Sequence, residues 1–312
     1  MTPTAHDPKP KRPSVAGRDP TAAAIAGKGW LQAHRWLLCR RAVQTALLAV
    51  FLVGPATVWL ARHGHLGQTW WPVKGNLASS LTLDWLPLSD PYVLLQSLLG
   101  GHAPLGTALL GGAIVLAFYL LLGGRLYCAW VCPINPVTDA AAWLRRKLKL
   151  RPPGRMPSKA LRLWLLAATL LASAATGTIA WEWVNPVSML HRALVFGFGA
   201  AWALVLAVFL YDLLVAPRGW CGHVCPVGAF YGLLGKRALL RVNAAGRAAC
   251  DDCMDCYAVC PEPQVIRPAL KQAGQTHPVI LASDCTTCGR CIDVCPQHVF
   301  RMSHRFRHRS EP

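Results

Sequence analysis

Charged residues are scarce in this chain. They make up 15% of its 312 residues, and only 14 residues are acidic, whereas roughly a quarter of the residues in a soluble domain are charged. This deficit argues against a single soluble domain, and a hydrophobic content of 54% excludes a disordered chain. The net charge of +18 would suit a nucleic-acid-binding protein, but the long apolar runs would not. We therefore expect a membrane protein with basic loops and no nucleic-acid partner.

Two motifs are also missing. The sequence contains no Cys-x-x-Cys-His motif, so no covalently attached haem is expected to carry electrons. No A-x-A cleavage site follows the apolar run behind Arg40-Arg41, and three further apolar runs come later in the chain. We therefore interpret these two arginines as anchors of a membrane span and not as part of a twin-arginine export signal.

Four apolar runs approach the length of about 20 residues that a bilayer core of about 30 Å requires. They are Ala42–Ala61, Leu105–Leu122, Leu161–Trp181 and Leu194–Ala216. The second run contains several glycines, which favour close helix packing. Any one run could be a buried helix of a soluble protein, but four such runs in one chain predict four transmembrane helices.

The basic residues indicate how these spans are oriented. The segments before, between and after the four runs hold 8, 2, 8, 1 and 12 lysines and arginines, and Arg162 lies inside the third run. Cytoplasmic loops carry the excess of basic residues. The pattern predicts a multi-pass protein of the bacterial inner membrane, with both termini in the cytoplasm and the two poor loops in the periplasm.

Two cysteine motifs near the C-terminus follow the spacing of bacterial ferredoxins with two clusters, C-x2-C-x2-C-x3-C-P. In this spacing, three cysteines of one motif bind one 4Fe-4S cluster and the fourth binds the other cluster. The predicted ligands of cluster 1 are Cys250, Cys253, Cys256 and Cys295, and those of cluster 2 are Cys285, Cys288, Cys291 and Cys260. Zinc is the alternative, but zinc sites use paired C-x2–4-C spacings.

A second kind of cysteine motif occurs twice, once behind the second apolar run and once behind the fourth. Each copy is a C-x3-C-P unit with an arginine three residues before its first cysteine and an aromatic residue directly before it. Because both copies follow spans that end on the same membrane face, we expect the four thiols of Cys128, Cys132, Cys221 and Cys225 to meet. They could bind a further iron–sulfur cluster or a zinc ion, or act as redox dithiols.

With these motifs in place, about residues 36 to 302 resemble the NapH family. The resemblance is carried by Cys128-Ala-Trp-Val-Cys132-Pro133, Asn185-Pro-Val-Ser-Met-Leu-His191, Gly219-Trp-Cys-Gly-His-Val-Cys-Pro-Val-Gly-Ala-Phe230, Cys250-Asp-Asp-Cys253 and Asp284-Cys-Thr-Thr-Cys-Gly-Arg-Cys-Ile-Asp-Val-Cys295. That family comprises membrane-bound, ferredoxin-type quinol dehydrogenase subunits of periplasmic nitrate reductase systems. The resemblance implies ubiquinol or menaquinol as the electron donor, and periplasmic iron–sulfur and cytochrome proteins as partners.

Quinol oxidation requires proton acceptors beside an apolar slot. The periplasmic end of the third run supplies Glu182 between two tryptophans, and the short loop behind it supplies His191. Solvated side chains at the ends of spans are the alternative interpretation. A periplasmic site would also lie across about 30 Å of hydrocarbon from cytoplasmic clusters. We therefore favour a quinol site nearer the C-x3-C-P units.

The predicted fold is mostly α: a four-helix transmembrane bundle followed by an α+β ferredoxin-like domain that binds two 4Fe-4S clusters. We expect a flexible basic tail over residues 1–35, a membrane domain over 36–241, a ferredoxin domain over 242–304 and a basic tail over 305–312. Three functions fit this organisation: a quinol-oxidising electron-transfer subunit, an electron-delivering maturation factor for a periplasmic redox partner, and a scaffold with structural clusters.

Overall fold

The computed structural model describes residues 19–65, 67–150, 156–197, 199–271 and 277–307. The chain divides into two compact units. The larger unit comprises Cys39–Leu240 and Ala282–Cys288, and the smaller unit comprises Met1–Leu38, Arg241–Leu281 and Gly289–Pro312. Most of the expected flexible tail, residues 1–18, lies outside the described residues.

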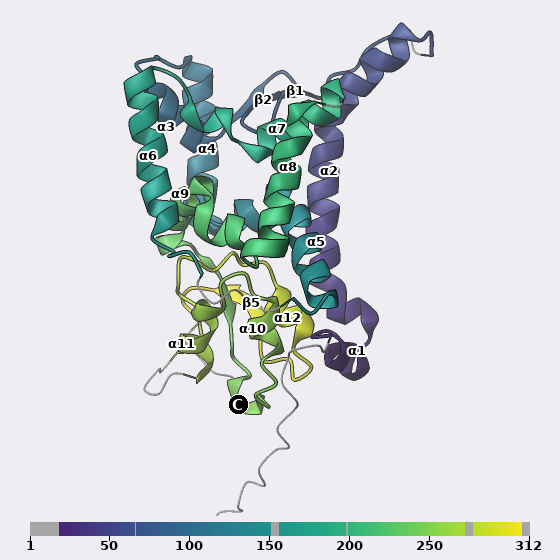
Figure 1. The fold of residues 1–312 in the computed structure, drawn as a ribbon, viewed down its shortest axis with the longest axis vertical. Coiled ribbons are helices and arrows are strands. Elements are labelled where there is room, and N and C mark those ends of the chain that lie inside the picture. The colour runs from purple at the N-terminus through teal and green to yellow at the C-terminus, as the bar shows by residue number, and fades with distance from the viewer. Residues whose placement is uncertain (1–18, 66, 151–155, 198, 272–276, 308–312) are drawn as a thin grey trace, which may run out of the picture. The chain divides into compact units, whose positions relative to one another are not determined.

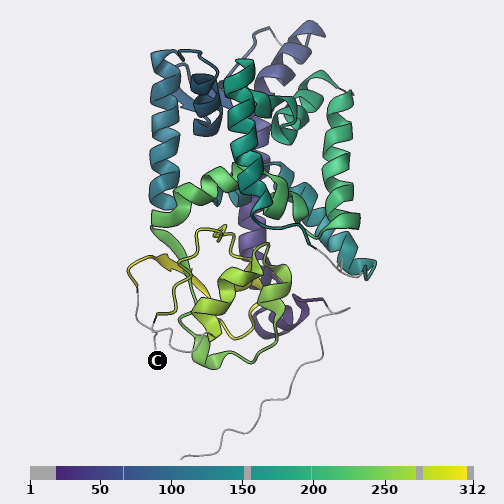
Figure 2. The same cartoon turned by 60° about the vertical axis from the view of Figure 1, so that its left-hand side comes forward.

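Helices dominate the larger unit (Figures 1 and 2). The long helices are α2 (Trp30–Arg62, which begins in the smaller unit), α4 (Gly106–Leu122), α6 (Leu161–Thr176) and α8 (Ala200–Leu210). The shorter ones are α3 (Pro91–Leu99), α5 (Ile134–Lys147), α7 (Pro186–Phe196) and α9 (Pro226–Leu234). Short helical turns connect them, among them η1 (Tyr127–Val131), η2 (Ala180–Trp183), η3 (Tyr211–Val215) and η4 (Trp220–Val224).

These elements occur in the same order twice. The series α2, α3, α4, η1 and α5 corresponds to the series α6, α7, α8, η4 and α9. Helices of the two series pack against each other, since α3 packs against α6, α5 against α8, and α4 against α9. The larger unit is therefore built from a structural duplication in which each half completes the core of the other.

The short helices α3 and α7 begin in the same way. Asp90 precedes Pro91, and its carboxylate accepts a hydrogen bond of 2.9 Å from the backbone N–H of Tyr92. Asn185 precedes Pro186, and its side-chain oxygen accepts a hydrogen bond of 3.0 Å from Val187. A side-chain cap followed by proline in the first turn is a strong start signal, because the proline lacks an N–H that would otherwise need a partner.

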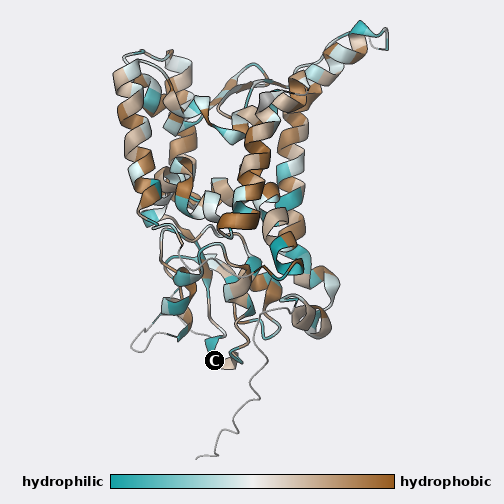
Figure 3. Ribbon diagram, in the orientation of Figure 1, coloured by the Kyte–Doolittle hydropathy of each residue, from teal (hydrophilic) through white to brown (hydrophobic). Residues whose placement is uncertain are grey.

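Only α2, among the described residues, is both long and apolar enough to cross a membrane. The apolar helices Gly106–Leu122, Leu161–Thr176 and Ala201–Val215 are shorter; the 17 residues of α4, for example, extend about 26 Å. The predicted four-helix transmembrane bundle is therefore not confirmed. Figure 3 shows hydrophobic residues along all four of these helices.

The third and fourth expected spans differ from the observed helices because of two glycines. Gly177 has the left-handed backbone conformation (φ 65°) and ends α6. Gly197 (φ 88°) ends α7, so the expected span Leu194–Ala216 is divided between α7 and the separate helix α8. Glycine adopts positive φ without steric cost and commonly ends helices.

The first loop contains a small antiparallel sheet that the sequence analysis did not predict. Its strands β1 (Val73–Gly75), β2 (Ser79–Thr82) and β3 (Leu86–Ser89) lie in chain order. The α4 glycines do provide close packing, although not between two long helices. Gly111 lies against the backbone of Pro87 in β3, and Gly112 lies against the Leu94 side chain of α3.

The smaller unit combines short helices with two strands. The strands are β4 (Leu240–Asn243) and β5 (Arg301–His304), and the helices are α1 (Ala22–Lys28), α10 (Asp255–Val259), α11 (Ile266–Lys271) and α12 (Arg290–Val294). This mixture agrees with the predicted α+β ferredoxin-like domain.

Residues 22–35 are helical, which differs from the expected flexible tail. Contacts with distant residues order this segment. The Lys28 ammonium donates hydrogen bonds to the carbonyls of Ile292 (2.6 Å) and Cys295 (3.2 Å). The carboxylate of Asp293 accepts hydrogen bonds from two backbone N–H groups of α2 just beyond this range.

Candidate iron–sulfur sites

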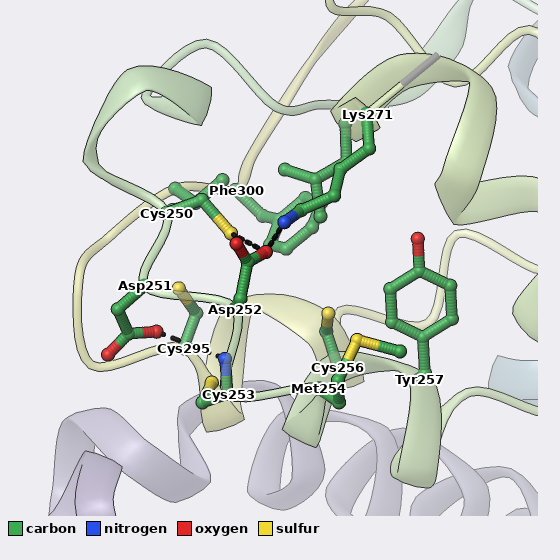
Figure 4. A pocket seen from close by; sticks show the side chains of 12 residues that line it. Cys250, Asp251, Asp252, Cys253, Met254, Cys256, Tyr257, Lys271, Cys295 and Phe300 are labelled. Atoms are coloured by element: carbon green, nitrogen blue, oxygen red, sulfur yellow. Dashed lines mark hydrogen bonds and ion pairs between the residues drawn. The ribbon is translucent and has the colours of Figure 1, made fainter. Parts of the chain in front are cut away.

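All four predicted ligands of cluster 1 line one cavity of the smaller unit (Figure 4). Cys250 and Cys253 come from the loop before α10, Cys256 lies in α10, and Cys295 directly follows α12. The helices α10 and α12 pack against each other and so bring Cys256 and Cys295 together. The cavity encloses about 360 Å³ of empty space, including the solvent at its mouth. Its remaining lining includes apolar side chains such as Met254 and Phe300.

The chemistry of this lining suits an iron–sulfur cluster, because its four predicted ligands are all cysteines and a 4Fe-4S cluster is held by four thiolates. The assignment of these four cysteines to one cluster stays a prediction from their spacing.

The two ferredoxin motifs share an unusual backbone. The second residue after the first cysteine has positive φ in both motifs, 60° at Asp252 and 48° at Thr287. The fourth residue does so as well, with 62° at Met254 and 74° at Gly289. Positive φ is costly for a residue other than glycine, most of all for a β-branched one. Its recurrence at matched positions indicates that the backbone bends in the same way in both motifs.

The four predicted ligands of cluster 2 are divided between the units. Cys285 and Cys288 lie in the segment Ala282–Cys288 of the larger unit, whereas Cys260 and Cys291 belong to the smaller one. Cys288 and Cys291 are buried. The assignment of these four cysteines to one cluster stays a prediction from their spacing.

Both C-x3-C-P units fold in the same way. A π-helical turn begins at the aromatic residue before the first cysteine, at Tyr127 in η1 and at Trp220 in η4. Each turn ends when the backbone N–H of the second cysteine donates to the carbonyl of that aromatic residue, from Cys132 over 3.0 Å and from Cys225 over 2.8 Å. Proline then leads into the next helix. Such π turns are rare and frequently occur at functional sites.

The four thiols of these units lie near one another, beyond the ends of the apolar helices. Burial raises the pKa of the Cys132 thiol, and the neighbouring Cys128 and Cys225 raise it further. Burial likewise raises the pKa of Cys221, and the other three thiols add to the effect. Four neighbouring, half-buried thiolates would repel each other, so a cationic metal or cluster core is the partner that would stabilise their deprotonated forms.

A side chain from the first helix of each series, α2 or α6, holds the π turn of that series. Gln44 of α2 donates a hydrogen bond of 2.9 Å to the carbonyl of Ala129, the residue after the first cysteine of the first unit. Arg162 of α6 donates a hydrogen bond of 3.4 Å to the carbonyl of Gly222, which occupies the same position in the second unit. The structural duplication thus extends to the support of both cysteine turns.

No hydrogen bond or ring contact joins the two quinol candidates, Glu182 and His191, within the described residues, and each has a different partner. The Glu182 carboxylate, in η2, accepts a hydrogen bond of 2.6 Å from the Asn185 amide. His191, in α7, lies edge-on to the ring of Phe51, with 6.1 Å between the ring centroids.

The sequence analysis did not identify the residues that hold the Cys285–Cys288 loop. The Arg125 guanidinium donates a hydrogen bond of 2.9 Å to the carbonyl of Asp284, and Arg162 forms an ion pair of 2.6 Å with the Asp284 carboxylate. The indole N–H of Trp130 donates to the carbonyl of Thr287 over 3.2 Å. The repeated arginine before each C-x3-C-P unit was the available signal, but spacing alone does not show its partner.

Comparison with known families supports both kinds of cysteine site. A 4Fe-4S binding domain matches residues 105–151 and again residues 196–243, so it covers each C-x3-C-P unit once. A 4Fe-4S dicluster domain matches residues 249–299. The dicluster match agrees with the two predicted ferredoxin clusters, and the double match agrees with the internal repeat.

Curated relatives cover nearly the whole chain. The ferredoxin-type protein NapH of Haemophilus influenzae is 49% identical over 93% of this chain and 99% of its own length. NapH of Escherichia coli is 48% identical over 93% of this chain and 96% of its own length. The methylamine utilization ferredoxin-type protein MauN of Methylorubrum extorquens is 53% identical over 92% of this chain and 95% of its own length.

No solved structure matches the chain. The relatives confirm the resemblance to NapH and add MauN, which the sequence analysis did not name. At this identity and coverage, the chain belongs to the family of ferredoxin-type electron-transport proteins that includes NapH and MauN.

Proposed function

We propose that this protein is a membrane-bound iron–sulfur electron-transfer subunit that accepts electrons from quinol and passes them towards a periplasmic nitrate reductase chain. The observation that carries the proposal is the cavity lined by Cys250, Cys253, Cys256 and Cys295 in the smaller unit, and the separate group of four neighbouring C-x3-C-P thiols in the larger unit. Bound iron–sulfur clusters would supply one-electron chemistry. The nitrate reductase system and its periplasmic iron–sulfur and cytochrome partners are inferred from the relationship to NapH.

The membrane assignment draws on the helix surfaces as well as on the sequence. Large apolar side chains are exposed on α4, α6 and α8, among them Leu110, Phe118, Trp164, Leu171 and Leu206. Large exposed apolar side chains of this kind suit contact with lipid. We propose a multi-pass protein of the inner membrane with both termini in the cytoplasm. An alkaline phosphatase fusion near Gly75 should be active and one after Pro312 inactive; the reverse would refute this topology.

We place the proton acceptors for quinol at the starts of the short helices α3 and α7. Asp90 and Glu182 lie near each other, and the Asp90 carboxylate accepts a hydrogen bond of 3.1 Å from Tyr231 of α9. The pKa of Asp90 is raised to about 6, mainly by burial and to a smaller extent by the charge of Glu182, while hydrogen bonds from Tyr92 and Tyr231 oppose the rise. A carboxyl group whose pKa lies near the working pH is suited to accept a proton.

The hydrogen bond between Asp90 and Tyr231 bears on the distance of about 30 Å that would separate a quinol site at the periplasmic face from cytoplasmic clusters. Tyr231 lies in α9, the helix that directly follows the second C-x3-C-P unit. An acceptor at Asp90 is therefore linked through one hydrogen bond to the helix behind the cysteines, whereas a site at the periplasmic rim would be separated from them by the bilayer. His191 is a second candidate acceptor, because burial lowers its pKa and so favours the neutral imidazole.

Oxidation of one quinol to quinone releases two electrons and two protons. In this proposal the residues Asp90, Glu182 and His191 accept the protons, while the electrons pass one at a time to the iron–sulfur sites. The half-buried position of Glu182 and its hydrogen bond to Asn185 would hold the carboxylate in place for this role.

A maturation factor that delivers electrons to a periplasmic redox partner, without oxidising quinol, is the second candidate. The relatives are a reason to consider this second function. MauN, named for methylamine utilization, is as similar to this chain as NapH is. The same arrangement of helices and cysteine sites would therefore serve different periplasmic partners.

The test is a redox titration of membranes, followed by electron paramagnetic resonance (EPR), with and without added quinol. Reduction of the clusters by quinol supports the electron-transfer subunit. Clusters that dithionite reduces and quinol does not would favour the maturation factor. Protein that contains iron but responds to neither reductant would favour a structural role.

A further inference from the structure

The two faces of α5 have different surroundings within the larger unit. One face packs against α8 and η3, and the buried guanidinium of Arg145 donates a hydrogen bond of 2.6 Å to the carbonyl of Leu213 in η3. The other face is exposed where the helix ends. Trp143 is 54% exposed there, and all five residues from Arg146 to Leu150 are exposed as well. The last turn of α5 therefore presents an accessible surface.

This surface combines large apolar side chains with basic ones. The exposed side chains of Leu148 and Leu150 alternate along the chain with those of Lys147 and Lys149. The Lys147 ammonium lies over the indole of Trp143, 4.9 Å from the ring centroid. Such a cation–π contact keeps a positive charge directly beside an apolar side chain. These five residues, Trp143, Lys147, Leu148, Lys149 and Leu150, are called the α5 patch below.

The α5 patch is positively charged. Within the part of the chain that the structure describes, neither Lys147 nor Lys149 forms an ion pair. The sequence contains no acidic residue between Asp139 and Glu182. Asp139 itself, two turns earlier in α5, pairs with Arg41 of α2 at 2.5 Å. The two lysines of the patch are therefore available to an anionic partner.

Helix stability explains only part of this composition. Basic side chains in the last turn interact favourably with the partial negative charge at a helix C-terminus. The helix end places Lys149 at φ 52°, and the backbone N–H of Leu150 donates to the carbonyl of Arg145 over 3.1 Å. Glycine is the usual residue at such a position, so the lysine adds charge at a steric cost. Neither effect accounts for the exposed Trp143, Leu148 and Leu150, because exposed apolar surface does not stabilise a helix end.

The place of the patch in the chain favours a lipid surface as its partner. The segment that contains the patch connects α4 to α6, and both helices are proposed membrane spans. The two ends of this segment therefore lie at the same membrane face, which is the cytoplasmic face in the proposed topology. Trp164, near the start of α6, is 74% exposed, and tryptophan is enriched where a span meets the lipid headgroups. Apolar side chains beside basic ones are typical of segments that lie in the membrane interface.

We propose that the α5 patch binds the headgroups of anionic phospholipids in the cytoplasmic leaflet. Lys147 and Lys149 contact the lipid phosphates, while Trp143, Leu148 and Leu150 enter the boundary between headgroups and acyl chains. A free phosphate ion would use the lysines but leave the apolar side chains in water, so a lipid fits the whole patch. The inference rests on the membrane topology of the proposed function and is independent of quinol oxidation.

Lipid titrations of the purified full-length protein in detergent, followed by thermal unfolding, test this proposal. Phosphatidylglycerol should raise the unfolding midpoint at a lower lipid-to-detergent ratio than phosphatidylcholine does. Lys149→Gln should raise the phosphatidylglycerol ratio needed for half of the maximal shift about fivefold, the effect of one basic side chain at an anionic membrane surface. Lys147→Gln/Lys149→Gln should raise this ratio further. Added salt should weaken the preference for phosphatidylglycerol, because salt screens exposed charges.

Three further variants serve as controls, and unfolding without added lipid shows whether each variant folds. Lys147→Arg/Lys149→Arg keeps both charges and should retain the preference for phosphatidylglycerol. Arg267→Gln removes one exposed charge from α11 in the smaller unit and should leave the preference unchanged. Trp143→Gln removes apolar contact and should weaken the binding of both lipids.

Equal effects of the two lipids on the wild-type protein, or an unchanged preference in Lys147→Gln/Lys149→Gln, would overturn the inference. So would an equal shift from inorganic phosphate alone. Binding of polyglutamate without any effect of phosphatidylglycerol would overturn it as well and would identify an acidic protein as the partner. A failure of the proposed function is distinguishable, because then quinol reduces no cluster or the alkaline phosphatase fusions show a different topology, while the lipid preference in detergent still occurs.

Discussion

The chain carries each of its cysteine motifs twice, and the two copies have different partners. In the first C-x3-C-P unit, Arg125 reaches the ferredoxin loop at Asp284. In the second unit, Arg218 at the same position pairs with Asp139 of α5. The aromatic residues, the π turns and the prolines are nevertheless alike. The duplication preserved the geometry of the cysteine turns, while the surrounding charges diverged.

The difference is instructive because it separates two roles that a repeat could have. The turns place the thiols, and this requires the same backbone in both halves. The arginines decide what each half is attached to, and this depends on residues distant in the sequence. Variants that treat the two copies differently should therefore separate cofactor binding from attachment.

The largest expected effect is the loss of one ferredoxin cluster. Cys253→Ser and Cys288→Ser each remove a ligand from a different predicted set. Iron and sulfide should fall by about one cluster in each variant, or by more if the domain unfolds, because bound clusters contribute to folding. Unchanged iron and sulfide in either variant would contradict the assignment of that cysteine.

The next effect tests whether the C-x3-C-P units act as one site. Cys132→Ser and Cys225→Ser should each abolish the same activity, and the double variant should cost little more, as expected for residues that act as a unit. Losses that multiply would show two independent sites. Metal retained by a Cys253→Ser/Cys288→Ser protein, beyond any residual ferredoxin iron, would identify metal at these units; four alkylatable thiols without metal would favour redox dithiols.

A smaller effect concerns the close contact between the halves. Gly124, before the first unit, lies against the carbonyl of Tyr231 and the backbone of Gly235, so a methyl group there would meet backbone atoms. Gly124→Ala should lower the free energy of unfolding by about 1–3 kcal/mol. Thermal unfolding in detergent measures it. Gly106→Ala, where no atom lies within 4 Å of the added carbon, is the control; equal stability of the two variants would contradict the tight contact.

The smallest effect concerns the support of the first π turn. Gln44→Met keeps most of the side-chain volume but removes the donor to Ala129, and leaving a buried carbonyl without this donor should cost about 1 kcal/mol. Gln32→Met, at an exposed position of the same helix, should cost nothing measurable. If the Gln44 and Gln32 variants are equally stable in thermal unfolding, the hydrogen bond from Gln44 does not stabilise the turn.

Local sequence patterns determined much of this protein. The spacing of Cys250, Cys253 and Cys256, with Cys295 from the second motif, predicted the set that lines one cavity, because a tight loop and a following helix place such residues with little help from elsewhere. The matched flanks of Cys128 and Cys221 predicted the repeat. The long apolar run at Ala42–Ala61 predicted the helix α2, since helix length follows directly from hydrophobic length.

Tertiary structure alone decided what depends on distant partners. The order of residues 22–35 comes from contacts with Ile292, Asp293 and Cys295, more than 250 positions away in the chain. The choice of Asp284 as the partner of Arg125 and Arg162 likewise follows from packing, because an arginine's sequence position states its charge but not which carboxylate or carbonyl it meets. The cysteine spacing specified which backbone turns carry the thiols, and only the fold specified which charged groups surround those turns.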